Sequence, residues 1–204
     1  MAIDGNKILH VVMEGSKIRD EKGIIPIFGV YVNLFFVDYY NHLSFEFMKK
    51  LGAEREAEAA MLLVQAAQEC AYATFQGIRN SREWEEIVEP MLDVKEDQIL
   101  GFAAVANALG WGEMKVKALV PEEKLVMHVN GWYEAPGYLQ FHDRSNSSKC
   151  YGIRGVAGAF MDLVYGETYP DGCFTFWAEE PFCLAKGDDC CEFIARKTPQ
   201  KNHS

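Results

Sequence analysis

The sequence has 204 residues and a formal net charge of −10, with 30 acidic against 20 basic residues. Apolar residues make up 49% of it and aromatic residues 13%, which excludes fibrous, collagen-like and disordered classes. The acidic balance argues against direct nucleic-acid binding, which requires a basic surface. No apolar run approaches the length of a membrane span, and no secretory signal is visible. We therefore expect a cytoplasmic protein with no membrane association.

The first half of the chain is expected to be largely helical. Residues 1–30 show no clear period and predict a short strand near Ile8–Met13 followed by a loop. From residue 32 to 51, apolar and aromatic residues recur at spacings of three and four, which indicates one face of a helix. Further helices are expected over residues 54–78, over 81–90, and from Asp93 or Asp97 to residue 109.

The second half predicts an antiparallel sheet with an inserted helix. Residues 114–120 and 125–129 form a hairpin by pattern and turn chemistry, and a turn-rich stretch over 130–146 follows. The helix expected over 147–165 contains Gly152, Gly155 and Gly158, which suggests that another backbone or a ligand passes close. Strands over 173–185 and 190–196 complete the sheet.

The order of these elements predicts an α+β fold, with a helical N-terminal half packed on an antiparallel sheet with an inserted helix. We expect one domain over residues 1–196, consisting of an N-terminal strand and loop (1–30), a helical part (31–110) and a part with the sheet, a helix and the cysteines (111–196). Residues 197–204 are expected to be a disordered tail.

Five of the six cysteines fall in the C-terminal part of the chain. If the hairpin turn lies near Gly187, Cys183 and Cys191 lie almost opposite each other on paired strands, with Glu180 earlier on the first strand. Cys150 lies at the N-terminal end of the preceding helix, where the helix dipole favours a thiolate. Three thiolates and one carboxylate could form a closed, structural zinc site. The alternative is that these cysteines are small buried hydrophobic residues.

Two segments resemble the 4-vinyl reductase domain family: Cys183–Phe193, similar to its C-terminal signature, and the glycine-rich Cys150–Gly158. That family includes the sensory domains of phenol-responsive transcription activators, and its fold is similar to that of transport-protein-particle subunits. The resemblance implies a zinc ion held by four residues that keep the Glu-x2-Cys-x7-Cys spacing: Cys150, Glu180, Cys183 and Cys191. Cys190 could replace Cys191 as a ligand. Residues 187–193 and 39–52 also resemble L-2-amino-thiazoline-4-carboxylate hydrolase-like proteins, which keeps an enzymatic function open.

The resemblance further implies a pocket for a small aromatic compound between the helices and the sheet. In the phenol sensors a Trp and a His hold the ligand hydroxyl. Here Trp132-Tyr133-Glu134 occupies the region of that Trp, whereas the region of the His matches a stretch around Trp111 that contains no histidine. This pattern favours an apolar pocket over phenol recognition itself, with core packing as the alternative for any one aromatic residue. The candidate lining residues are Trp132, Tyr133, Trp111, Phe102, Tyr40, Phe160 and Phe176.

Three functions remain open. The first is small-molecule binding by a domain with a structural zinc site. The second is an enzyme on the same scaffold, a hydrolase or lyase of a small cyclic or heterocyclic substrate, with His142, Asp143 and His42 as weak acid–base candidates. The third is an assembly module like the tethering-complex subunits. A symmetric homodimer is expected because residues 31–47 carry more aromatic side chains than one core face can hold. These are Tyr31, Phe35, Phe36, Tyr39, Tyr40, Phe45 and Phe47.

Overall fold

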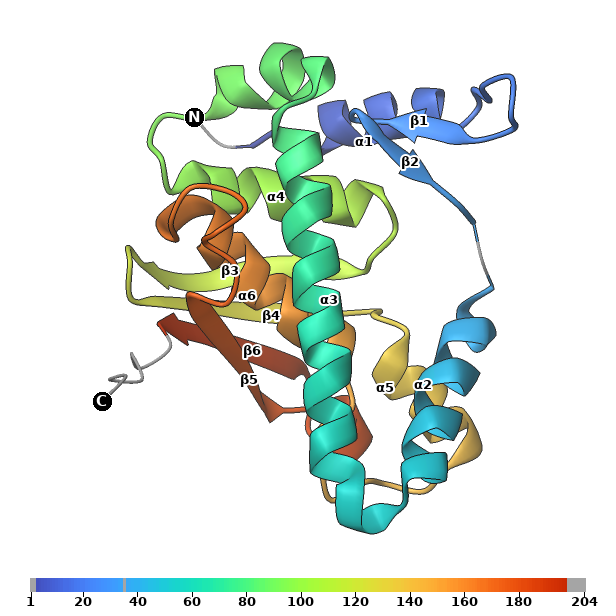
Figure 1. Cartoon of the computed structure of the whole chain (residues 1–204). Coiled ribbons are helices and arrows are strands. Elements are labelled where there is room, and N and C mark those ends of the chain that lie inside the picture. The colour runs from blue at the N-terminus through green and yellow to red at the C-terminus, as the bar shows by residue number, and fades with distance from the viewer. Residues whose placement is uncertain (1–2, 35, 198–204) are drawn as a thin grey trace.

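The computed structural model describes residues 3–34 and 36–197 and places helices against one face of a four-stranded antiparallel sheet (Figure 1). The order across the sheet is β3-β4-β6-β5. The helix α6 (Tyr151–Tyr165) packs against β4, β5 and β6, and the long helix α3 (Glu56–Arg79) lies across α6. This is the predicted α+β fold. The strands are β3 (Glu113–Val120), β4 (Lys124–Asn130), β5 (Phe176–Phe182) and β6 (Cys191–Lys197).

The N-terminal segment is a helix, so the prediction of a strand at Ile8–Met13 is wrong. Helix α1 (Gly5–Gly15) begins after Asp4, whose carboxylate accepts hydrogen bonds from two backbone N–H groups of the first turn. Ile8 and Val12 are buried, and a spacing of four places two residues on one face of either a helix or a strand, so this pair does not distinguish the two. A hairpin of β1 (Ile25–Ile27) and β2 (Val30–Val32) follows where a loop was expected.

Helix α2 (Val37–Leu51) begins later than the periodicity predicted. Val32 belongs to β2, Phe36 is in an extended conformation before the helix, and Phe35 lies outside the described residues. The predicted apolar face of α2 is largely at the surface, with Tyr39 54% and Leu43 55% exposed. The periodicity therefore identified a helix but not a buried face.

The remaining helical elements connect these layers. Helices α1 and α4 pack together at one end of the molecule, and α2 and α5 pack together at the other (Figure 1). The segment expected to be a helix over 81–90 consists mainly of π-helical and 3-10 turns. Helix α5 lies in the stretch expected to be turns. Its Pro136 is in the first turn of the helix, where proline is tolerated. The bounds are η1 (Ala53–Arg55), η2 (Trp84–Val88), η3 (Glu89–Met91), α4 (Asp97–Ala108), α5 (Glu134–Phe141) and η4 (Leu184–Lys186).

Helices α3 and α6 cross so closely that the crossing requires glycine. A Cβ atom on Gly155 would lie 2.5 Å from the backbone nitrogen of Gln68 and 2.7 Å from the carbonyl oxygen of Val64. The side chain of Gln68 fills the space beside Gly158 and is fully buried. Its Nε2 donates to Asp162 Oδ2 at 2.7 Å. Of the two expectations for the glycines of this helix, another backbone or a ligand passing close, the first is confirmed at Gly155, whereas Gly152 and Gly158 face side chains.

Strand β6 extends to Lys197, and the rest of the expected tail, residues 198–204, lies outside the described residues. Across residues 3–34 and 36–197, no helix combines the length and the apolar character needed to cross a membrane.

Candidate metal centre and neighbouring clefts

Four buried acidic side chains converge where α6, β5 and β6 meet. Cys150 precedes the first turn of α6, Glu180 is on β5, Cys183 follows that strand, and Cys191 begins β6. One potential ligand atom from each residue lies within 4.8 Å of the others. The sulfur atoms of Cys150 and Cys191 are 3.7 Å apart. The structure thus brings together the four residues that the sequence nominated, in a cluster that could hold a metal ion.

The turn between β5 and β6 sets the positions of the last two cysteines. Its backbone reverses at Gly187, whose φ of +94° is in the left-handed region that favours glycine. The carboxylate of Asp188 accepts a hydrogen bond from the Cys183 backbone N–H at 2.8 Å, and Leu184 donates its N–H to the Cys191 sulfur at 3.4 Å. Cys190 is half-buried and does not belong to the cluster, so Cys191 is the cysteine placed among the four.

The cluster concentrates four ionisable groups in a buried space. Hydrogen bonds from Cys150 and Cys191 lower the pKa of the Cys183 thiol. Burial, followed by the charge on Cys183, raises the pKa of Glu180 to about 9. Without a cation, one negative charge therefore opposes the ionisation of its neighbours, and a dication would reverse this effect by favouring all four ionised forms.

Two carboxylates lie at the N-terminus of α6. Glu180 Oε2 accepts the Cys150 N–H at 3.0 Å, and Glu134 Oε2 accepts the Gly152 N–H at 2.8 Å. The other oxygen of Glu180, Oε1, is buried without a hydrogen-bond partner among the described residues. Burial raises the pKa of Glu134 to about 7. The sequence does not predict Glu134 at this site, because a glutamate in a turn-rich stretch has no local feature that separates it from an ordinary surface residue.

The aromatic candidates divide into two groups. Trp111 and Trp132 contact each other with ring centroids 6.1 Å apart, Trp132 contacts Tyr133 at 4.4 Å, and Tyr133 contacts Tyr40 at 6.1 Å. The two Trp rings and the Tyr133 ring are half-buried, and Tyr40 is 40% exposed, so these rings form a partly accessible row. We call this group the aromatic row. The other candidates, Phe102, Phe160 and Phe176, are fully buried in the main hydrophobic core.

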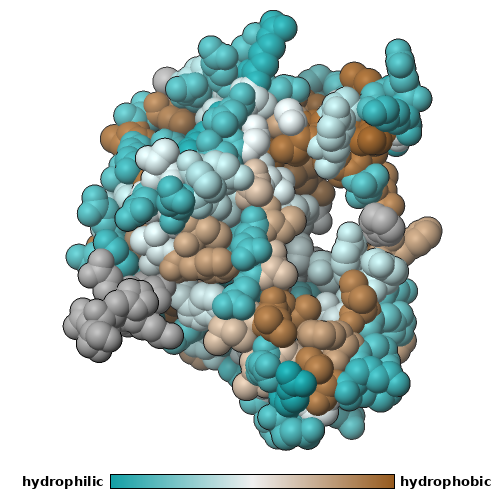
Figure 2. Space-filling view, in the orientation of Figure 1, coloured by the Kyte–Doolittle hydropathy of each residue, from teal (hydrophilic) through white to brown (hydrophobic). Residues whose placement is uncertain are grey.

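The space-filling view in Figure 2 shows a deep hollow between the part of the molecule that contains α1 and β2 and the part that contains α2 and α5. The aromatic row runs from the end of α4, which packs on α1, to α2. Trp111 follows α4, Trp132 and Tyr133 follow β4, and Tyr40 is on α2. Trp132 directs its indole N–H to Glu134 Oε2 at 2.5 Å. The row therefore has an anchored tryptophan beside half-buried rings.

The weak acid–base candidates lie near α2 and α5. His142 follows α5 and stacks on Tyr138 with ring centroids 4.7 Å apart. His42 is an exposed residue of α2, 5.2 Å from the ring of Phe141, and Asp143 is exposed in the loop after His142. The structure places both histidines at the same end of the molecule but at the surface.

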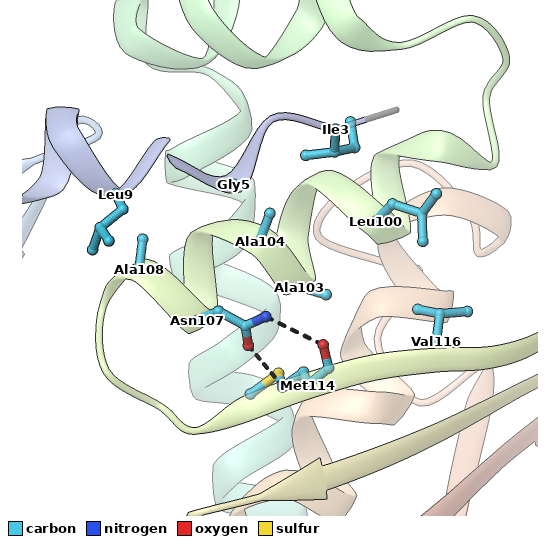
Figure 3. A pocket seen from close by; sticks show the side chains of 10 residues that line it. All are labelled: Ile3, Gly5, Leu9, Leu100, Ala103, Ala104, Asn107, Ala108, Met114 and Val116. Atoms are coloured by element: carbon cyan, nitrogen blue, oxygen red, sulfur yellow. Dashed lines mark hydrogen bonds between the residues drawn. The ribbon is translucent and has the colours of Figure 1, made fainter. Parts of the chain in front are cut away.

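An apolar groove of about 510 Å³ lies between α1, α4 and β3 (Figure 3). Small side chains of α4 and apolar residues of β3 form most of its walls. Its amide side chain, Asn107, exchanges two hydrogen bonds with the backbone of Met114 and so fixes the start of β3 (Figure 3). The groove therefore offers apolar area but little polar chemistry to orient a ligand.

Comparison with solved structures establishes the fold. The structure of the phenol-responsive sensory domain of the transcription activator PoxR with phenol matches with a TM-score of 0.71 and 13% identity, covering 97% of this chain and 92% of that one. A trafficking protein particle complex subunit 3 from Naegleria fowleri, covalently bound to palmitic acid, matches with a TM-score of 0.50 and 14% identity, covering 80% and 95%.

A vinyl-4-reductase family protein from Methanocaldococcus jannaschii matches with a TM-score of 0.48 and 12% identity, covering 95% and 94%. No protein-family model and no curated protein sequence matches this chain. The likeness in fold to the phenol sensors and the tethering-complex subunits, which the sequence segments suggested, is confirmed by the structures. At these identities the comparison concerns the fold alone.

Proposed function

We propose that this protein binds a small aromatic or cyclic molecule and that a structural zinc ion stabilises its binding domain. The observation that carries the zinc assignment is the geometry of the four-residue cluster. Tetrahedral zinc with Zn–S bonds of about 2.3 Å separates its sulfur ligands by about 3.8 Å. The Cys150 and Cys191 sulfur atoms are 3.7 Å apart.

The donor set also fits zinc. Three thiolates and one carboxylate are ligands that zinc accepts in four-coordinate sites. The unpartnered Oε1 of Glu180 is a buried acceptor that a cation would satisfy, while Oε2 remains bonded to the Cys150 N–H. Cys150, Glu180, Cys183 and Cys191 would together hold the ion, which would link α6 to β5 and β6. A site filled by four protein ligands has no open position, so its role would be structural.

The test is the metal content of protein purified without added zinc. We expect close to one zinc per chain in the wild type and in Cys190→Ser, which changes the neighbouring thiol outside the cluster. Cys183→Ser should lose the metal and lower the midpoint of thermal unfolding, because structural zinc contributes folding free energy. Equal zinc in both variants, or no zinc in the wild type, would contradict the assignment.

The ligand site we propose is the hollow beside the aromatic row. Half-buried Trp and Tyr rings supply flat apolar surface, and the anchored indole of Trp132 limits the rotamers lost on binding. The fold supports this function because a protein of the same fold senses phenol. The stretch around Trp111, in the region where the phenol sensors have their histidine, contains none. We therefore expect an apolar site that takes an aromatic or cyclic compound.

Binding can be followed by tryptophan fluorescence with phenol and cyclohexanol as probes. We expect saturable changes that are lost in Trp132→Phe and kept in Trp177→Phe, since Trp177 lies on β5 away from the row. If Trp177→Phe abolished the response and Trp132→Phe kept it, the proposed location would be wrong. If neither probe bound at millimolar concentration, the ligand class would be wrong.

We also propose that the protein forms a homodimer through the segment before α2 and the exposed face of that helix. Leu34 is 79% and Phe36 89% exposed, and they continue into the exposed Val37, Tyr39 and Leu43. A contiguous set of large apolar side chains at the surface is typical of a protein interface.

All six cysteines are unpaired, which supports a reducing compartment such as the cytoplasm.

Sedimentation velocity tests the dimer. Leu43→Glu should shift the protein to a monomer, because it places a charge in the interface. Val120→Glu is the control, since Val120 is similarly accessible but lies on the edge strand β3. A wild-type monomer at high micromolar concentration, or a dimer that survives Leu43→Glu and dissociates in Val120→Glu, would refute the proposed interface.

A further inference from the structure

A second cleft lies at the end of the molecule where α2 and α5 meet the start of α3. It has a volume of about 300 Å³, at the lower end of the range for small-molecule sites. It contains no residue of the metal cluster or of the aromatic row. The residues that line it are Phe45, Met48, Lys49, Gly52, Ala53, Glu56, Tyr138, His142 and Lys149.

The feature that distinguishes this cleft is a buried lysine. Lys149 is only 6% exposed, and its ammonium donates to Glu56 Oε1 at 2.7 Å. It also lies 5.2 Å from the centre of the Tyr138 ring. Glu56 is held in place by Ser147, whose hydroxyl donates to the same carboxylate oxygen at 3.1 Å. The hydrogen bond from Lys149 lowers the pKa of Glu56, so this carboxylate is ionised at neutral pH.

One half-exposed carboxylate is modest compensation for a buried ammonium. The side chain of Glu56 is 44% exposed, and an ammonium has three N–H donors. Lys49 also lines the cleft, but its side chain is 73% exposed and pairs with Glu46 at 3.3 Å, so Lys149 is the buried cation of this site. The N–H donors of Lys149 that Glu56 does not use favour an anion with a single negative charge, because Glu56 would repel a second one.

The walls beside Lys149 are flat and apolar. The Tyr138 and His142 rings are stacked, and the Phe45 ring meets Tyr138 edge-on at 5.2 Å. Met48 is 8% exposed and adds a flexible thioether that packs well on rings. An apolar wall next to a single cation is a suitable environment for an aromatic ring that carries one charged group.

We propose that this cleft binds a small aromatic carboxylate, with its ring against Tyr138, His142 and Met48 and its carboxylate on the ammonium of Lys149. The carboxylate would accept one of the N–H donors that Glu56 does not use. This site is separate from the hollow of the aromatic row, so the two proposals can fail independently.

The test uses benzoate as the probe and benzamide as its neutral counterpart, with binding followed by NMR of methionine methyl groups. Benzoate should shift the Met48 methyl signal saturably and leave that of Met91, which belongs to η3 at the other end of the molecule, unchanged. Benzamide should bind at least about tenfold more weakly, because it lacks the charge that strengthens the hydrogen bond to lysine.

Lys149→Met keeps the apolar stem and removes the charge, and it should weaken benzoate binding by about tenfold or more. The matched control is Lys95→Met, because Lys95 also lies 5.2 Å over a tyrosine ring, that of Tyr165, but outside the cleft. It should leave the affinity unchanged within about twofold. Phe45→Leu, which alters the wall at a distance in sequence from the metal cluster, should weaken binding independently of any effect on Cys150.

Equal affinity for benzoate and benzamide would overturn the proposal, as would unchanged benzoate binding in Lys149→Met. A benzoate-induced change in tryptophan fluorescence that Trp132→Phe abolishes, with no shift of the Met48 methyl signal, would also overturn it, because the probe would then occupy the hollow of the aromatic row. If Lys149→Met fails to fold, the benzamide comparison and Phe45→Leu still decide the question with folded protein.

Discussion

Replacement of Gly155 by alanine should destabilise the protein although alanine is the better helix former. The new Cβ would lie 2.5 Å from the Gln68 backbone nitrogen, 0.9 Å short of the 3.4 Å at which contact becomes ordinary. The neighbouring atoms are backbone atoms of α3, which no rotamer change can move. Overpacking of this kind costs about 3 kcal/mol at its upper end, and the helix propensity of alanine returns about 1 kcal/mol.

The expected net loss is therefore about 2 kcal/mol in the free energy of unfolding, which corresponds to a decrease of about 4–8 °C in Tm for a chain of this size. Urea unfolding and calorimetry measure the two quantities. The control is Gly5→Ala, because a Cβ there meets nothing within 4 Å. Its effect should stay below about 0.5 kcal/mol. A Gly155→Ala protein as stable as the wild type would show that α3 and α6 do not cross as closely as described.

Three further changes test other parts of the structure. Burial raises the pKa of Asp162 to about 6, so folding favours the protonated carboxyl. The stability of the wild type relative to Asp162→Asn should therefore fall by about 2–3 kcal/mol as the pH rises from about 4 to 6. A difference in urea unfolding that does not change with pH would contradict this. Glu134→Ala should lower the free energy of unfolding, measured in urea, by about 1–3 kcal/mol, because it leaves the Trp132 indole N–H without its acceptor. Glu134→Gln should recover most of this loss. Equal losses in the two variants would argue against the hydrogen bond. Asp4→Ala should reduce the protection of α1 against hydrogen exchange by about 1 kcal/mol while leaving the zinc content unchanged, and unaltered exchange would mean that the cap does not stabilise the helix.

The sequence predicted most elements whose pattern is local. The long α3 and the β3–β4 hairpin match their periods, because apolar spacing follows from the geometry of each element. The strand predicted at Ile8–Met13 was wrong because the five apolar residues in that segment fit either period. Helix α5 was missed because Pro136 and Gly137 are turn formers by type, and only their position within the first turns makes them compatible with a helix.

The burial of α2 shows the limit of the same reasoning. Its aromatic spacing is helical, yet Tyr39 and Leu43 are more than half exposed. Periodicity indicates that one face of the helix is apolar. Whether that face is buried depends on how the extended segment before the helix orients the helix. The sequence predicts that a second subunit covers these aromatic side chains. The structure places the exposed ones on α2 and on the segment before it.

The metal cluster combines both kinds of information. Residue types and the Glu-x2-Cys-x7-Cys spacing nominated Glu180, Cys183 and Cys191 because two of these lie across one hairpin, which is a local arrangement. Cys150 is 30 residues before Glu180, and only the packing of α6 against the sheet brings its sulfur within 4.8 Å of the others. The identity of the ion stays a prediction.

What the sequence by itself determined is the α+β class, the order of most elements and the chemistry of the nominated side chains, because these depend on composition and on spacing along the chain. What only the tertiary structure decided is which side chains share a space. The ion pair of Glu56 with Lys149 joins residues 93 positions apart, and the Gln68–Asp162 bond joins residues 94 apart. Such contacts depend on the crossing of α3 and α6, which is set by the packing of two whole helices and by the backbone approach that Gly155 permits.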